Sequence, residues 1–125
     1  MNHIPAFVLG GVPAVNMNVR HRINFSVGDA VFYISLPQSG GGSRSVLLVR
    51  DIEMGRAKKL ANADEIGCAA DYVPQNGLSG DRDTALAQAG AECLRQNGIK
   101  MVRTDSSLPM IFVSHLRTHC FFFDL

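Results

Sequence analysis

Two histidines near the carboxyl end of the chain, His115 and His119, have the spacing of two metal ligands on one face of a helix. A zinc peptidase of the H-E-x-x-H type would have a glutamate directly after the first histidine, but Leu116 stands there. The sequence offers no evident third ligand. A histidine that meets the dipole at the end of a helix is the simpler interpretation, and we expect no metal in this chain.

The other candidates for chemistry also lack a complete motif. Gly40–Gly42 have no Lys-Ser/Thr after them and lie between two apolar runs, which is typical of a hairpin tip and not of a phosphate loop. The carboxylates are scattered at the expected ends of strands and helices, where acids often cap, as Asp51 does. No serine lies in a nucleophile elbow, and no cysteine lies in a reactive motif. We therefore expect no catalytic residue in this chain.

One polar stretch has few acids nearby to neutralise it. It contains Asn16, Asn18, Arg20, His21 and Arg22. The stretch is either a solvated loop or a surface that contacts a partner domain or a small anionic ligand. The second interpretation is attractive because the planar guanidinium of arginine can hold a carboxylate through two hydrogen bonds. Asn16, Arg20, His21 and Arg22 are therefore the candidate contact residues.

Composition narrows the class of protein. Hydrophobic residues make up 46% of the 125 residues and charged residues 18%, which is typical of one globular domain with its own core. The net charge of +1 gives no electrostatic footprint for nucleic acid or for an anionic membrane. Apolar runs are too short to span a membrane, and the first residues do not resemble a signal peptide. We expect a cytoplasmic protein without a nucleic-acid or membrane partner.

The three cysteines are expected to be buried, reduced thiols, because they are odd in number and lie among apolar residues. They are Cys68, Cys93 and Cys120.

The pattern of apolar residues predicts an α/β fold with a mixed β-sheet flanked by helices. Strands are expected at Ala6–Leu9, Ala30–Leu36, Ser45–Arg50, Cys68–Val73, Ile99–Arg103 and Cys120–Leu125. Helices are expected from Asp51 to about Asn62, at Asp81–Asn97 and from Ser107 to about His119, with residues 12–26 irregular. Two strands around a Gly/Ser-rich loop predict a β-hairpin, and the later alternation of strands and helices predicts parallel crossovers.

Two of these helices have expected packing faces. In the first, Ile52, Leu60 and Ala63 are expected to face the sheet. Gly55 should be closely packed, since glycine inside a helix costs about 1 kcal/mol relative to alanine. The second helix has an apolar stripe of Leu86, Ala89, Cys93 and Leu94.

Several segments of the sequence follow one another in a recognisable order. The first half has Leu9-Gly-Gly-Val-Pro-Ala-Val-Asn16, the hairpin strands Val31–Leu36 and Val46–Arg50, and Glu53 followed by Ala57. The second half has Leu94-Arg-Gln-Asn-Gly98, then Ile99-Lys-Met-Val-Arg-Thr-Asp105, Leu108-Pro109 and Phe121-Phe-Phe-Asp124. This order resembles the N-terminal domain of the creatinase/prolidase/aminopeptidase P family, with its ribonuclease H-like motif.

The resemblance implies that residues 1–125 form a single N-terminal domain of a metal-dependent Xaa-Pro peptidase or creatinase-like hydrolase. In that family the catalytic domain is a separate C-terminal pita-bread domain with two divalent metal ions (Mn, Co or Zn), and none of its motifs is present here. The implied role is to build a homodimer and to shape the active site. The alternative is a free-standing α/β interaction or small-ligand-binding module.

Overall fold

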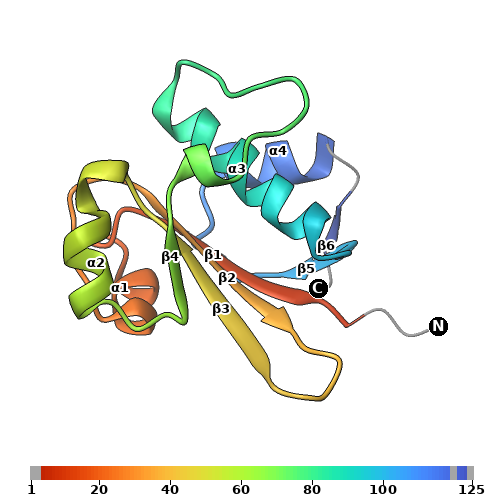
Figure 1. Ribbon diagram of the computed structural model, residues 1–125, viewed down its shortest axis with the longest axis horizontal. Helices are drawn as coiled ribbons and strands as arrows, with labels where there is room; N and C mark the ends of the chain where they lie inside the picture. The colour runs from red at the N-terminus through yellow and green to blue at the C-terminus, as the bar shows by residue number, and fades with distance from the viewer. Residues whose placement is uncertain (1–3, 119–120, 124–125) are drawn as a thin grey trace.

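The computed structural model describes residues 4–118 and 121–123 as one mixed sheet with helices on both faces (Figure 1). The strands are β1 (Ala6–Gly11), β2 (Val31–Pro37), β3 (Ser43–Leu48), β4 (Glu65–Gly67), β5 (Met101–Arg103) and β6 (Phe122–Phe123). The α-helices are α1 (Met17–Ile23), α2 (Met54–Leu60), α3 (Arg82–Gln96) and α4 (Met110–Thr118), and the 3₁₀ turns are η1 (Asp51–Glu53) and η2 (Ala69–Asp71). The predicted α/β class is confirmed.

The sheet has the order β4-β3-β2-β1-β5-β6. β1 and β3 each pair antiparallel with β2, while β4 is parallel to β3, β5 to β1 and β6 to β5. The turn between β2 and β3 contains Gly41 and Gly42, whose φ angles of +92° and +75° suit glycine best. The predicted hairpin and the parallel crossovers are thus confirmed.

Each face of the sheet carries its own core, because successive residues of a strand point to opposite faces. On one face α3 and α4 pack against a group that includes Val8, Phe32 and Ile34. On the other face α1 and α2 pack against a group that includes Leu9 and Tyr33. Figure 1 shows the two pairs of helices on opposite sides of the strands.

The predicted second helix, α3, agrees well with the structure. Its whole apolar stripe is buried, namely Leu86, Ala89, Cys93 and Leu94. Asp81 caps the helix by accepting hydrogen bonds from the N–H of Thr84 at 3.0 Å and from its hydroxyl at 2.7 Å. These bonds hold the pKa of the Asp81 carboxyl below its ordinary value. The sequence therefore predicted both the face and the start of this helix.

The interpretation of residues 12–26 as irregular is wrong, because this segment contains α1. The helix has seven residues, and only Val19 and Ile23 among them are buried. Two apolar positions are too few to display a helical period in the sequence. The visible signal was instead the cap at Asn16 and the left-handed end at Asn24, where φ is 50°.

The packing predictions around α2 are wrong for Ile52, Leu60 and Gly55, whereas Ala63 is partly buried and packs against the core of this face, as predicted. Ile52 and Leu60 are 68% and 57% exposed, and Ala57 is the residue of α2 that is buried. A Cβ at Gly55 would meet nothing within 4 Å. Asp51 does not cap α2, because its carboxylate accepts from the N–H of the next residue, at 2.9 Å, within the 3₁₀ turn that precedes the helix.

Two elements in the second half differ from the predictions. The strand expected at 68–73 is replaced by β4, which ends at Gly67, and by the turn η2. The helix α4 begins at Met110 and not at Ser107, since the residues before it form a turn. The described part of the last strand is β6, within the expected range 120–125.

The cysteines of the described residues are free. Cys93 is fully buried, and this burial raises the pKa of its thiol. Cys68 is half-buried, while Cys120 lies outside the described residues. The prediction of a buried, reduced thiol is thus confirmed for Cys93.

The helix α3 approaches the sheet closely at Gly90. A Cβ built there would overlap the ring of Phe32, so this ring fills the space of the missing side chain. That ring is fully buried and lies 4.8 Å, centroid to centroid, from the ring of Phe112.

We expect Gly90→Ala to lower the free energy of unfolding by about 1–3 kcal/mol, because the ring of Phe32 must move inside a packed core. Gly55→Ala is the matched control, in a helix where the added methyl meets nothing. It should be neutral or stabilising by up to about 1 kcal/mol. Urea denaturation measures both variants, and a Gly90→Ala variant as stable as the wild type would contradict this packing.

The buried carboxylate of Glu92 makes a second, pH-dependent contribution. It accepts hydrogen bonds from Nε of Arg95 at 2.7 Å and from Nε2 of Gln96 at 2.9 Å, and these bonds lower its pKa to about 2. A carboxyl whose pKa is lower in the folded state stabilises that state above its unfolded pKa, and the contribution disappears as the pH falls through the folded value.

We therefore expect the free energy of unfolding to fall between about pH 5 and pH 2, with Glu92 as one cause. Glu92→Gln should have a smaller loss of stability over this range, measured by urea denaturation at several pH values. An identical pH dependence in the wild type and in Glu92→Gln would show that these hydrogen bonds do not persist in solution.

Candidate functional site

Asn16 joins three segments of the chain. Its Oδ1 accepts hydrogen bonds from the N–H groups of Asn18 at 3.1 Å and Val19 at 3.3 Å, which caps α1. Its Nδ2 donates to the carbonyl of Gly10 at 3.3 Å and to the hydroxyl of Ser107 at 3.1 Å. The amide is therefore occupied by contacts that fix the position of α1 against β1 and against the loop after β5.

A second bridge runs parallel to the first. Nδ2 of Asn18 donates to Oδ2 of Asp105 at 2.8 Å. The other carboxylate oxygen of Asp105 accepts from the hydroxyl of Ser107 at 2.7 Å and from its N–H at 2.9 Å. The first turn of α1 and the loop after β5 are thus held together by side chains from opposite halves of the chain.

Arg22 is exposed, and its guanidinium lies over two aromatic rings of the sheet. Its Cζ is 5.3 Å from the ring centroid of Phe7 on β1 and 5.9 Å from that of Tyr33 on β2. A guanidinium at these distances is attracted to the electron-rich faces of both rings. None of the salt bridges between described residues involves Arg22, so its charge is balanced by aromatic faces and solvent.

An open hollow of about 540 Å³, the α1 pocket, lies beside this arginine. It is lined by Phe7, Leu9, Asn18, His21, Arg22, Asn62 and Asp105. The guanidinium, the imidazole and two side-chain amides supply donors, and Asp105 supplies the carboxylate. An anionic group of a ligand or a partner would find several donors here above an apolar floor.

The structure brings two of the four predicted contact residues together. His21 and Arg22 line the α1 pocket. Arg20 lies on the same helix, is exposed and does not line the pocket, and Asn16 lines a neighbouring hollow. The alternative of a solvated loop is wrong for the backbone, which is helical.

Sequence reasoning missed Asn62 and Asp105 as members of this pocket. Asp105 follows the end of β5, and residues just after the carboxyl ends of strands often line sites in α/β folds. Asn62 follows α2, and its N–H donates to the carbonyl of Ile23 at 2.6 Å, which brings it against the end of α1. That contact between two helices leaves no mark in the sequence.

Within the described residues, no group of three or more His, Cys, Asp or Glu side chains could hold a metal ion. His115 is half-buried on α4, and His119 lies outside the described residues. None of the described helices is long and apolar enough to cross a membrane.

We expect Arg22→Ala to lower the free energy of unfolding by about 0.5–1 kcal/mol, because it removes a cation from two aromatic faces. Arg20→Ala, two positions away on the exposed surface of the same helix, should change it by less than about 0.5 kcal/mol. Thermal unfolding of both variants separates them. Equal stability of the two variants would show that the arrangement over Phe7 and Tyr33 contributes nothing measurable.

Comparison with known proteins identifies the fold. No family model and no curated protein matches the sequence. Among solved structures, the prolidase from Pyrococcus horikoshii OT3 superposes with a TM-score of 0.62 at 20% identity, over 97% of this chain and 28% of that chain. An Xaa-Pro aminopeptidase from Streptococcus pyogenes gives a TM-score of 0.62 at 12% identity, over 95% of this chain and 75% of that chain.

The X-Pro aminopeptidase from Thermotoga maritima MSB8 gives a TM-score of 0.54 at 15% identity, over 97% of this chain and 31% of that chain. This chain thus spans less than a third of the length of the Pyrococcus and Thermotoga proteins. The resemblance predicted from the sequence is confirmed at the level of the fold: nearly the whole chain has the structure of one part of prolidase and X-Pro aminopeptidase chains.

Proposed function

We propose that this chain is the non-catalytic N-terminal domain of a metal-dependent Xaa-Pro peptidase, of the aminopeptidase P or prolidase type, or of a creatinase-like hydrolase. One observation carries the proposal. Of this chain, 97% superposes on a prolidase at a TM-score of 0.62, yet this match covers only 28% of the prolidase chain. A domain that superposes almost completely on one part of a peptidase is expected to support the function of the remaining part of such a protein.

The two divalent metal ions of such an enzyme, Mn, Co or Zn, do not fit the described residues, which contain no suitable group of ligands. We therefore assign metal binding and peptide hydrolysis to a C-terminal pita-bread domain outside this chain. The chain's own contribution is to homodimer assembly and to the wall of the active site.

Within that proposal, α1 is the element that reaches the neighbouring catalytic domain. The pair His21 and Arg22 sits on the rim of an open pocket, while Arg20 extends into solvent beside it. A carboxylate of a peptide substrate or of a partner is the natural counterpart, because guanidinium groups bind carboxylates through charge-assisted hydrogen bonds. The strands contribute only the apolar side chains of Phe7 and Leu9 to this pocket, so its cationic groups come from α1.

The second candidate is a free-standing α/β module that binds a partner or a small ligand. It is favoured by the match to the Streptococcus pyogenes chain, of which this fold makes up 75%. Sequencing the transcript beyond the codon for Leu125 separates the two candidates. Spaced Asp, Asp, His, Glu and Glu codons downstream support the first, and an immediate stop codon supports the second.

In the full-length parent, we expect Arg20→Ala and Arg22→Ala to raise KM for Xaa-Pro peptides by about three- to tenfold, or to weaken the dimer, with a smaller change in kcat. Steady-state kinetics with added manganese and analytical ultracentrifugation measure the two effects.

The matched control is Arg117→Ala on α4. Its guanidinium also lies over a ring, 5.5 Å from the centroid of Phe123, but on the opposite face of the sheet from α1. It should leave KM and assembly unchanged. If Arg20→Ala and Arg22→Ala behave like this control, α1 does not face the active site or the dimer partner.

A further inference from the structure

The topology creates two crevices at the carboxyl ends of parallel strands. After β3 the chain enters α2 on one face of the sheet, and after the neighbouring β4 it enters α3 on the other face. The neighbours β1 and β5 diverge in the same way, into α1 and α4. Such divergence opens a crevice between strands, and ligands of α/β proteins bind in crevices of this kind.

The crevice between β1 and β5 is bridged by the chain's own side chains. Asn16 bonds to Ser107 at 3.1 Å across it, and Asn18 bonds to Asp105 at 2.8 Å. These hydrogen bonds occupy the polar groups that a ligand would need. The side chains in the crevice between β1 and β5 therefore hold the two halves of the chain together.

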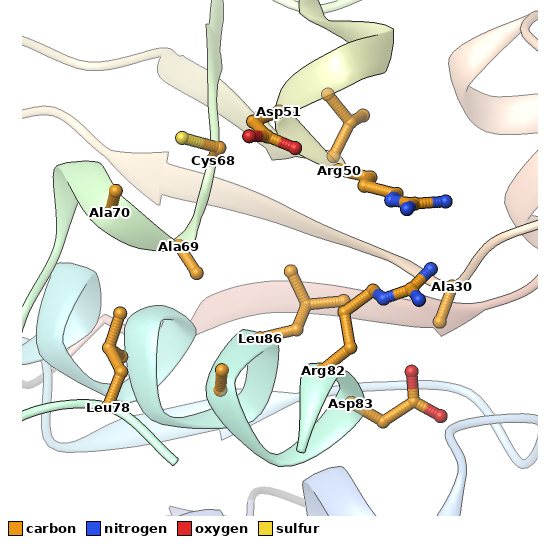
Figure 2. A pocket seen from close by; sticks show the side chains of 12 residues that line it. Ala30, Arg50, Asp51, Cys68, Ala69, Ala70, Leu78, Arg82, Asp83 and Leu86 are labelled. Carbon is orange, nitrogen blue, oxygen red and sulfur yellow. The ribbon is translucent and has the colours of Figure 1, made fainter. Parts of the chain in front are cut away.

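The crevice between β3 and β4 is open and forms a pocket of about 310 Å³, shown in Figure 2. Its apolar lining includes Val49 after β3, Ala69 after β4 and Leu86 on α3. The volume lies at the lower end of the range for small-molecule sites, about 300–1,000 Å³. The pocket thus fits one small molecule with an apolar group, and it is too small for a dinucleotide.

Cations and carboxylates both surround this pocket. Arg50 and Arg82 extend toward the same side of it in Figure 2 and share one carboxylate, that of Asp29, at 3.6 Å and 3.1 Å. Each uses a single Nη1 for this contact, while a guanidinium carries five N–H donors. Two cations on one carboxylate leave an excess positive charge and free donors at this end of the pocket.

Unpaired negative charge is present as well. Asp51 and Asp83 line the pocket, and neither takes part in a salt bridge within the described part of the chain. The carboxylate of Asp51 accepts the N–H of the next residue, at 2.9 Å, and Figure 2 shows it beside Cys68. A simple anion would be repelled by these acids, and a simple cation by the arginines.

We propose that this pocket binds a zwitterionic α-amino acid with an apolar side chain. The carboxylate of the ligand pairs with Arg50 and Arg82, and its ammonium group pairs with Asp51. Its side chain contacts Leu86 and the alanine residues that line the pocket. All of these residues belong to this chain. The site therefore functions whether or not a catalytic domain follows, and its test is independent of the proposed function.

The test is titration of the 125-residue chain with L-leucine, followed by ¹H–¹⁵N correlation spectra. We expect saturable shifts that are largest for residues 50–52, 68–70 and 82–86. Isocaproate lacks the ammonium group and isoamylamine lacks the carboxylate, so each should bind at least about tenfold more weakly. Glycine, which lacks the side chain, should bind more weakly as well.

Two variants test which side chains bind the carboxylate and the ammonium group of leucine. Arg82→Gln and Asp51→Asn, both at exposed positions, should each weaken leucine binding by at least about tenfold. Arg117→Gln, at an exposed arginine of α4 that does not line this pocket, should leave it unchanged, and the wild-type dispersion of the spectra reports that each variant is folded.

Three results would each overturn the proposal. The first is the lack of saturable shifts in the wild type up to about 10 mM leucine, a weak limit for a specific site. The second is isocaproate or isoamylamine binding as tightly as leucine, and the third is a set of shifts that lies outside the β3–β4 crevice.

Discussion

The absence of a side chain at Gly90 determines how closely α3 approaches the sheet. The ring of Phe32, at the centre of the sheet, occupies the space where a Cβ would be and also packs against Phe112 of α4. The side chain of Phe32 thus determines the distance of both α3 and α4 from the sheet. Because the start of α3 forms one wall of the pocket between β3 and β4, the width of that pocket depends on the same contact.

On the other face, which has its own apolar core, the helix α1 also depends on polar contacts. α1 buries only two of its seven residues, and a helix this short is unstable alone. It is held by the cap of Asn16, by the bridge from Asn18 to Asp105, and by the attraction of Arg22 to two rings. Of these residues, Asn18, Arg22 and Asp105 also line the α1 pocket, so changes there affect both stability and any contact the helix makes.

The success of the sequence predictions followed the amount of apolar surface in each element. The apolar stripe of α3 and the nearly continuous apolar runs of β2 and β3 bury many residues, so the sequence predicted these elements. The short helices α1 and α2 bury two residues and one residue, so polar residues dominated their sequences. Only part of the α1 pocket could be predicted, for a related reason. His21 and Arg22 were predicted because they lie in a polar stretch with few acids nearby. Asn62 and Asp105 join them only through tertiary contacts that link distant parts of the chain.

The central position of β1 has a consequence for the order in which the chain folds. β1 pairs with β2, which follows it closely, but it also pairs with β5, which lies near the opposite end of the sequence. During synthesis the β1–β2–β3 meander can form early, yet its apolar face stays uncovered until α3 and α4 have emerged. Contacts between residues this far apart in the sequence slow folding, and they prolong the time during which apolar surface is exposed to solvent. The nascent chain is therefore most prone to aggregation after its first half has emerged and before its second half can cover it.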